Sequence, residues 1–373
     1  MDEILLLLKK LGGILMLKKR FKAVSILLAA SVMGLTLVGC GKSSVAKTNN
    51  EKIVNIFTWA NYVPDNVIKA YEKKTGIKVN YSNFSTNEEM LAKLQASKGG
   101  QYDVIICADY MVQIMSKQKN LLLKEINTSA IPNYKNLDKA YLGQYYDKTN
   151  KYSVPYSLGS QMIVYNPDKV KIDVKGISDL WDPSLKGSAV LLNDPRSVIG
   201  MALTKLGYSI NETDPAKLAE AKAELKKLRA NVKVFDADTP MTSLINGDTT
   251  IGVMWGSQAS AALKANPKFK IVYPKEGMQF EEDNLIIPVN APHAKNAEDF
   301  INFVLEGKAS SDITTSIEYI NVNTAAKQFM PKTLLNNKAV YIPSEEFNKA
   351  KHLQDAGSAA KDYDLIWSEF KQQ

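Results

Sequence analysis

The stretch that decides the fold runs from Ile53 to Cys107 and reads IVNIFTWANYVPDNVIKAYEKKTGIKVNYSNFSTNEEMLAKLQASKGGQYDVIIC. Three short runs in it are rich in apolar and β-branched residues and are bounded by polar or turn-forming ones. Such runs are typical of β-strands. The sequence therefore predicts strands at residues 53–57, 77–81 and 104–107.

Helix boundaries lie between these strands. Pro64 occupies the first position of a predicted helix that ends at Gly76. Thr86 and Glu89 form a capping box for a second helix, which ends at Gly99-Gly100. The order strand, helix, strand, helix, strand predicts an α/β fold with a mostly parallel sheet and helices on both faces.

The same alternation returns later in the chain, where strands are predicted at residues 189–192 and 250–254. A helix with Asp214 as N-cap and Pro215 as its first residue lies between them. Because 373 residues exceed what one hydrophobic core usually supports, two lobes are expected. The helix carries an apolar stripe, interpreted as lobe packing, at Leu218, Ala221, Leu225 and Leu228.

Composition and charge exclude some classes of protein. The chain is 45% hydrophobic and 23% charged, as an ordinary globular protein is. Its net charge is +8, but the first 40 residues hold +4 of this, and the rest is too scattered to predict nucleic-acid binding. Only two cysteines occur, Cys40 and Cys107, so a disulfide framework is not expected. Cys107 lies in a strand-like run and is interpreted as a small buried hydrophobe.

The N-terminus reads as an export signal. A basic start at residues 18–22 precedes an apolar stretch at 23–37, which is shorter than a membrane-spanning helix needs. The stretch closes with Leu37-Val38-Gly39-Cys40, which resembles a bacterial lipobox. We expect a signal peptide at residues 1–39, with Met16 as a possible true start, and a tether at 40–52. Diacylation of Cys40 would hold the protein on the outer face of the cytoplasmic membrane.

No familiar catalytic or metal motif stands out. The two histidines, His293 and His352, lie in polar surroundings, and neither a catalytic triad, a set of metal ligands nor a phosphate-binding loop is evident. No cofactor or metal is therefore predicted, although enzymes built on paired carboxylates stay possible.

Aromatic and acidic residues recur just after predicted strands, where ligands of open α/β sheets bind. Carboxylates suit the ammonium ends of an alkyl cation, and flat rings suit its methylenes and cation–π contacts. Each residue alone could merely cover the core at a strand end. The residues are Trp59, Tyr62, Tyr110, Asp194 and Trp255.

Further motifs lie in order along the chain. They are Phe57-Thr58-Trp59-Ala60-Asn61-Tyr62-Val63-Pro64, Thr75-Gly76-Ile77-Lys78-Val79, Tyr102-Asp103-Val104-Ile105, Val154-Pro155-Tyr156, Asp179-Leu180-Trp181, Met201-Ala202-Leu203, Leu206-Gly207-Tyr208 and Tyr273-Pro274-Lys275-Glu276-Gly277. In these motifs the sequence resembles the bacterial spermidine/putrescine-binding proteins. The resemblance implies a type II periplasmic-binding fold: two α/β lobes joined by a hinge, with the ligand cleft between them. Lobe one would comprise residues 53–158 and 284–325, and lobe two residues 159–283 and 326–373.

Site residues follow from the resemblance position by position. It implies that Asp194 and Asp283 pair with ammonium groups, with Asp283 just ahead of a strand-like run at 285–288. The aromatic box implied by the resemblance consists of Trp59, Tyr62, Tyr110, Trp255 and Tyr319.

The chain also departs from the family pattern. Ala108 stands where the family has a serine, Ser197 where it has a second acid, and Glu281 where it has a tryptophan. We expect Glu281 to take over an ammonium contact, which leaves the preferred chain length of the ligand open. The family's C-terminal glutamine matches either Leu353 or, with a shift of one residue, Gln354.

The resemblance implies a monomeric binding protein, not an enzyme, that captures a polyamine such as spermidine or putrescine and delivers it to the permease of an ABC importer. Two alternatives stay open from the sequence. One is a binding protein for another small organic solute, and the other is an exported, lipid-anchored enzyme.

Overall fold

The computed structural model describes residues 52–347 and 349–372. The predicted signal peptide, Cys40 and the tether up to residue 51 lie outside the described residues. The first half of the fold begins with the predicted strands and helices, in the predicted order. Its elements are β1 (Ile53–Thr58), α2 (Asp65–Thr75), β2 (Lys78–Asn83), α3 (Asn87–Ala96), β3 (Val104–Ala108) and α4 (Asp109–Ser116).

Two of the helix boundaries predicted in this half, Gly76 and the Thr86 cap, are confirmed, whereas Pro64 is the N-cap of α2 instead of its first residue and α3 ends at Ala96, before Gly99. Gly76 follows α2 with a φ of 69°, a left-handed conformation that glycine adopts at little cost. The backbone N–H of Glu89 donates to Thr86 Oγ1 at 3.1 Å, and Glu89 Oε2 accepts from the N–H of Ser85 at 2.8 Å. The local sequence therefore fixes where α2 ends and where α3 begins.

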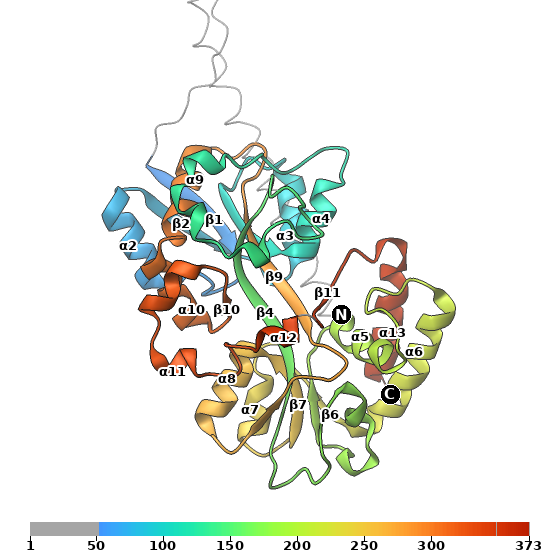
Figure 1. Cartoon of the computed structure of the whole chain (residues 1–373). Helices are drawn as coiled ribbons and strands as arrows, with labels where there is room; N and C mark the ends of the chain where they lie inside the picture. The colour runs from blue at the N-terminus through green and yellow to red at the C-terminus, as the bar shows by residue number, and fades with distance from the viewer. Residues whose placement is uncertain (1–51, 348, 373) are drawn as a thin grey trace, which may run out of the picture. The chain divides into compact units, whose positions relative to one another are not determined.

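Two long strands connect the halves of the sheet. These are β4 (Val154–Tyr165) and β9 (Gln279–Ile286), which pair antiparallel and run side by side through the centre of the fold (Figure 1). Two of the three predicted lobe boundaries, at 158/159 and 283/284, fall inside these two strands, and the third, at 325/326, falls inside the 3-10 helix Thr324–Phe329. The strand order is β2-β1-β3-β9-β4-β7-β5-β6, with three short strands added at the sides.

The second half repeats the α/β pattern. The helices that follow β9 in the chain then pack on both halves. Its central helix α6 buries the predicted stripe at Leu218, Ala221, Leu225 and Leu228. The elements are β5 (Ala189–Leu191), α5 (Pro195–Lys205), α6 (Pro215–Leu228), β6 (Val232–Phe235), α7 (Pro240–Ile245), β7 (Ile251–Trp255), α8 (Gly256–Ala265), β8 (Lys270–Val272), α9 (Ala294–Val304), α10 (Gly307–Ile317), β10 (Ile320–Asn321), α11 (Lys332–Leu335), α12 (Ser344–Phe347), β11 (Lys351–His352) and α13 (Ala360–Gln372).

The sheet is parallel only within each half. β2, β1 and β3 are parallel, as are β7, β5 and β6, whereas β9 runs antiparallel to β3 and β4, and β4 runs antiparallel to β7. The short strand β11 pairs with β9 in parallel. The expectation of a mostly parallel sheet therefore holds for each lobe but not for the strands that cross between them. Crossing strands must run in opposite senses because one leaves a lobe and the other returns to it.

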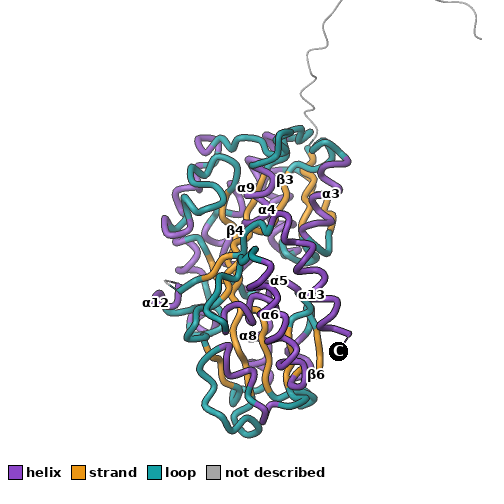
Figure 2. The backbone as a smooth tube through the Cα atoms, turned by 90° about the vertical axis from the view of Figure 1, so that its right-hand side faces the viewer, coloured by secondary structure: helices purple, strands orange, loops and turns teal. Residues whose placement is uncertain are grey.

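One hydrophobic cluster spans both lobes and includes Val54 of β1 and Met254 of β7, and two further clusters lie in one lobe each. One packs α3 and α4 on the first half, around Phe57, Leu94 and Met111. Another packs α5, α6 and α13 on the second half, around Leu191 and Leu225. Figure 2 looks onto the side that carries α4, α5 and α13. Together with the crossing strands, these clusters define a two-lobe α/β fold.

Cys107 is fully buried in the cluster that packs α3 and α4. Burial raises the pKa of its thiol well above the ordinary value. Among the described residues it is a free cysteine. The interpretation of Cys107 as a small buried hydrophobe is confirmed.

Candidate functional site

The acidic run of β9 lies at the centre of the candidate site. Asp283 is 5% exposed and sits between two strands, opposite Ala108 of β3 and Ser157 of β4. The expectation that Asp283 just precedes a strand is wrong, because β9 already begins at Gln279. Three consecutive acidic residues are not typical of a β-strand. They lie in a strand here because β9 pairs with β3 on one side and with β4 on the other.

Two hydroxyl groups contact the Asp283 carboxylate. Tyr62 Oη donates to Oδ2, and Ser157 Oγ donates to the same oxygen at 3.5 Å. The two hydroxyls also lie 2.8 Å apart. Because Tyr62 follows β1 and Ser157 lies in β4, residues far apart in sequence fix this carboxylate in one orientation.

Burial, together with neighbouring carboxylates, raises the pKa of Glu281 and Asp283. Burial raises the pKa of Asp283 from 3.8 to about 7, and the Asp109 carboxylate adds to this rise, while the hydrogen bonds from Tyr62 and Ser157 oppose it. Burial also raises the pKa of Glu281 well above its usual range, with further contributions first from Asp283 and then from Asp109. In the described part of the chain, no lysine or arginine forms an ion pair with either Glu281 or Asp283. The charged groups that shift the pKa of Glu281 and Asp283 are therefore acidic, whereas Arg196 lies beside Asp194 and opposes the rise in its pKa.

Aromatic rings gather around Tyr62, which bonds the Asp283 carboxylate. The ring of Tyr62 meets that of Trp59 at 5.2 Å and that of Tyr319 at 6.1 Å, both edge to face. Tyr156 lies behind Tyr62 and donates its hydroxyl to the Tyr62 carbonyl at 2.7 Å. Three of the predicted aromatic residues are thus brought together, and one of them contacts the predicted acid.

Trp255 ends β7 and lies over the crossing strand β4. A Cβ added to Gly159 would stand 3.3 Å from Trp255 Cε3, so the indole packs directly on this glycine. Gly159 in turn pairs with Glu281 on β9. The structure therefore brings the predicted ring of Trp255 next to the strand position of the predicted acid Glu281.

Asp194 is the N-cap of α5. Its Oδ1 accepts a hydrogen bond from the N–H of Ser197 at 2.7 Å, so one oxygen stabilises the helix. Burial raises the pKa of Asp194, and the neighbouring Glu88 charge contributes to the rise. Asp194 thus combines a capping role, which its sequence position also permits, with a place beside the other cleft carboxylates.

Tyr110 lies on α4 and faces the same region. Its hydroxyl donates to Glu88 Oε1 at 3.1 Å. Burial raises its pKa, with further contributions from Glu88, Glu281 and Asp194. Tyr110 is therefore close to carboxylates from α3, β9 and the start of α5.

Two predicted residues are less clearly directed at the cleft. Ser197 is buried, and its hydroxyl donates to Gln161 Oε1 at 2.7 Å. Gln354 is exposed and is fixed through its backbone, whose N–H donates to Asn211 Oδ1 at 2.8 Å. Leu353, the other match to the family's glutamine, is buried. The Ser197 side chain and the Gln354 backbone are therefore held by local hydrogen bonds, and neither bond is directed at Glu281 or Asp283.

Sequence reasoning missed Glu88, Asp109 and Ser157. Glu88 is an exposed acid in the first turn of α3, which by itself is ordinary helix chemistry. Asp109 begins α4 and is fully buried, and Ser157 directly follows the Val154-Pro155-Tyr156 motif. Only the pairing of β3 and β4 with β9 brings the last two beside Asp283, so no local pattern could reveal them.

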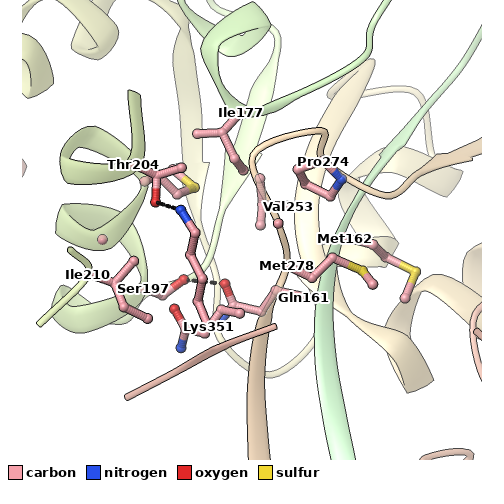
Figure 3. A pocket seen from close by; sticks show the side chains of 14 residues that line it. Gln161, Met162, Ile177, Ser197, Thr204, Ile210, Val253, Pro274, Met278 and Lys351 are labelled. Atoms are coloured by element: carbon pink, nitrogen blue, oxygen red, sulfur yellow. Dashed lines mark hydrogen bonds between the residues drawn. The ribbon is translucent and has the colours of Figure 1, made fainter. Parts of the chain in front are cut away.

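A separate small cavity lies behind Ser197 and Gln161 (Figure 3). Its volume is about 20 Å³, enough for roughly one water molecule. Gln161 Nε2 has no hydrogen-bond partner here, and Lys351 Nζ donates to Thr204 Oγ1 at 3.3 Å. The cavity is too small for an organic solute, and its lining contains none of the aromatic residues described above.

Comparison with known proteins places the chain in a family. Residues 66–354 match the bacterial extracellular solute-binding proteins. The chain belongs to this family. It is 36% identical over 348 residues to the spermidine/putrescine-binding periplasmic protein of Salmonella typhimurium, covering 92% of this chain and 97% of that protein.

Solved structures agree with this assignment. A spermidine/putrescine ABC transporter protein of Listeria monocytogenes superposes with a TM-score of 0.79 at 30% identity, covering 86% of this chain and 99% of the other. A lipoprotein of Treponema pallidum superposes with a TM-score of 0.78 at 25% identity, covering 86% and 100%. The chain thus has the two-lobe fold of periplasmic binding proteins, and its relatives are extracytoplasmic.

Between residues 52 and 372, residue 348 aside, no helix has both the length and the apolar character required to cross a bilayer. The same residues contain no group of three or more histidine, cysteine or acidic side chains placed to hold a metal ion.

Proposed function

We propose that this protein binds a polyamine between its two lobes and delivers it to the permease of an ABC transporter. The observation that carries the proposal is the buried Asp283 carboxylate, which two hydroxyls orient, with aromatic rings gathered around Tyr62 and no lysine or arginine ion-paired to Asp283 among the described residues. The charge of a buried carboxylate without a cationic partner is costly, as the raised pKa of Asp283 reflects, and a bound cation would offset that cost. The names of the relatives in Salmonella and Listeria support a polyamine as that cation.

Each predicted residue has a part in the proposed site. Asp283 and Glu281 hold ammonium groups on the crossing strand, and Asp194 holds one from the second lobe. We place Ser197 and Gln354 at the margin of the proposed cleft. The rings that flank the methylene chain are Trp59, Tyr62, Tyr110, Trp255 and Tyr319.

The proposed lobes are residues 53–158 with 284–325 and residues 159–283 with 326–373. Contacts from both lobes to one ligand stabilise a closed arrangement, because the ligand interacts fully only when the lobes meet. We place no catalytic residue in this cleft and propose a monomeric binding protein without enzymatic turnover.

Thermal denaturation with a ligand panel tests the proposal. Putrescine and spermidine should raise the melting temperature, because a ligand that binds only the folded protein stabilises it. Glucose and neutral amino acids should not. Calorimetry of the positive ligands then gives affinity and stoichiometry. Stabilisation by sugars or amino acids, and not by polyamines, would transfer the protein to another ligand class. A turnover screen that consumed an envelope substrate would favour the enzyme alternative.

We further propose that Cys40 is diacylated and anchors the protein to the outer face of the membrane. The run Leu37-Val38-Gly39-Cys40 and the lipoprotein relative in Treponema pallidum support this. Two acyl chains suffice for stable anchoring. Mass spectrometry of the mature protein should show an N-terminal lipid-modified Cys40. An unmodified Cys40 would end this part of the proposal without affecting ligand binding.

A further inference from the structure

The feature that points beyond the contacts already described is a polar side chain buried in a crossing strand. Gln161 lies in β4, is 5% exposed, and is followed by the buried apolar run Met162-Ile163-Val164. Its Oε1 accepts a hydrogen bond from Ser197 Oγ at 2.7 Å, and Ser197 is 1% exposed. Burying an amide costs free energy that an apolar side chain at the same position would not. We therefore expect Gln161 to have a task other than packing.

Ser197 connects this amide to the proposed ligand site. It is the third residue of α5, and its backbone N–H donates to Oδ1 of the N-cap Asp194 at 2.7 Å. Its hydroxyl donates in another direction, to Gln161, and Figure 3 shows this bond as a dashed line. The two bonds together tie the first turn of α5, with the Asp194 carboxylate, to the crossing strand β4.

The same strand also holds a carboxylate of the other part of the site. Ser157 of β4 contacts Asp283, whereas Gln161 is joined to Asp194 through the two bonds just described. Ser157 and Gln161 are separated by an even number of residues, so their side chains point to the same face of the strand. Their separation along a strand is about 13 Å. One rigid strand therefore sets the spacing of two carboxylates that come from different elements.

The nitrogen of the amide faces the small cavity described above. Gln161 Nε2 is buried without a hydrogen-bond partner in the described part of the chain, and it borders the volume of about 20 Å³. Gln279 Oε1 lies on the same cavity, 3.9 Å from where a Cβ on Gly200 would stand. One water molecule fits there and would accept from Nε2 and donate to Gln279. Such a water would keep the amide turned with its oxygen toward Ser197.

We infer that Gln161 is a positioning residue for ligand binding: through Ser197 it holds the Asp194 carboxylate in place relative to β4, where this carboxylate pairs with an ammonium group. The inference rests on the proposed function. Without the amide oxygen, Ser197 Oγ can turn to a carbonyl of its own helix, as serine hydroxyls commonly do. The first turn of α5 then loses its bond to β4. Because charge-assisted hydrogen bonds are short and directional, a small displacement of the carboxylate weakens them.

Calorimetry with spermidine at pH 7.5 on the full mature protein tests the bond itself. Gln161→Met keeps the size of the side chain and removes the acceptor, and Ser197→Ala removes the donor. Each variant should bind about threefold to tenfold more weakly than the parent. The variant with both changes should bind no more weakly than the weaker single variant. If Ser197→Ala weakens binding and Gln161→Met does not, Ser197 acts on the ligand directly and the inference is wrong.

A second double-mutant cycle tests whether the effect passes through Asp194. Asparagine is also a good N-cap, so Asp194→Asn removes the charge and leaves α5 in place. Asp194→Asn should weaken binding, and Gln161→Met should cause no further loss in that background. Additive losses, or full affinity in Asp194→Asn, would overturn the inference while spermidine binding by the parent upholds the proposed function. If the parent binds no polyamine, the proposed function itself fails.

A matched control removes a buried hydroxyl elsewhere in the second lobe. Thr249 is 1% exposed, lies just before β7 at its amino end, and places Oγ1 3.0 Å from Ser243 Oγ. Thr249→Val should lower the melting temperature about as much as Ser197→Ala and leave the affinity for spermidine unchanged. An equal loss of affinity in Thr249→Val would show a general loosening of the lobe and overturn the inference. Should Gln161→Met not fold, Ser197→Ala combined with Asp194→Asn decides by the same cycle.

Discussion

Replacing Asp283 by asparagine should have opposite effects on ligand affinity and on the stability of the free protein. The side chain is 5% exposed and accepts hydrogen bonds from Tyr62 and Ser157, which an asparagine oxygen can still accept. Asp283→Asn therefore keeps the shape of the site and removes its charge. Loss of the charge leaves a bound ammonium group without its partner.

The structure gives a magnitude for each effect. Removing one member of a buried ion pair costs about 3–5 kcal/mol, which is roughly 150-fold to 5,000-fold in Kd. Because the pKa of Asp283 is about 7, half of the free molecules at pH 7 already carry the proton. Ionising them costs about 0.4 kcal/mol, which lowers the expected loss only twofold. We therefore expect spermidine affinity to fall at least about 75-fold.

The stability effect has the opposite sign. A carboxyl pKa raised from 3.8 to about 7 means that the folded state holds the ionised form poorly. Folding stability is therefore lost as the pH rises from about 4 through 7, by up to about 4 kcal/mol. Asp283→Asn removes this loss. The free variant should melt higher than the parent at pH 8 and like the parent at pH 4.

Calorimetry with spermidine at pH 7.5 and thermal melts of the ligand-free protein at pH 4, 6 and 8 measure both effects. The reasoning about a functional carboxylate is refuted if the variant binds within threefold of the parent. A variant that loses affinity and is also less stable at pH 8 would instead show that Asp283 supports the structure.

Three further variants probe the rest of the cleft. Glu281→Gln should weaken binding of spermidine about tenfold or more and leave folding intact, because it removes a charge beside Asp283; equal affinity for every polyamine would refute the ammonium contact. Glu88→Gln should weaken binding of the longer polyamine about threefold. As a control, Asp65 is an exposed acid in the first turn of α2, and Asp65→Asn should leave the affinity unchanged. Equal effects of the two variants in calorimetry would assign Glu88 to helix capping alone. Gly159→Ala places a Cβ 3.3 Å from the Trp255 ring, so the indole must move and cation–π contact of about 0.5–2 kcal/mol is weakened; unaltered Trp fluorescence and affinity would contradict the role of this ring.

Local sequence predicted the elements of each lobe well. Pro64, Gly76 and the pair Thr86 and Glu89 specify where helices begin and end through backbone geometry and capping bonds, and these depend on near neighbours only. The crossing strand β9 was recognised only in part. Its residues Glu281 to Asp283 are acidic, and their burial depends on pairing with β3 and β4, which local patterns do not contain.

The same distinction separates the site residues that sequence reasoning found from those it missed. Trp59, Tyr110 and Trp255 follow strands, and the rule that ligands bind at strand ends selects them. Asp109 and Ser157 carry no such pattern. They reach Asp283 through sheet register across more than 120 residues, so only the assembled fold reveals that they lie beside it.

The placement of charge in this fold links binding to closure. The carboxylates lie on β9, which belongs to both lobes, while the rings come from the end of β1, the end of β7 and the residue before β10. In the closed arrangement these rings exclude water from Glu281 and Asp283, which raises the cost of their charge. A bound polycation offsets that cost, so it interacts better with the closed state than with the open one. A ligand needs such a difference in interaction free energy in order to shift the population of molecules from the open to the closed state.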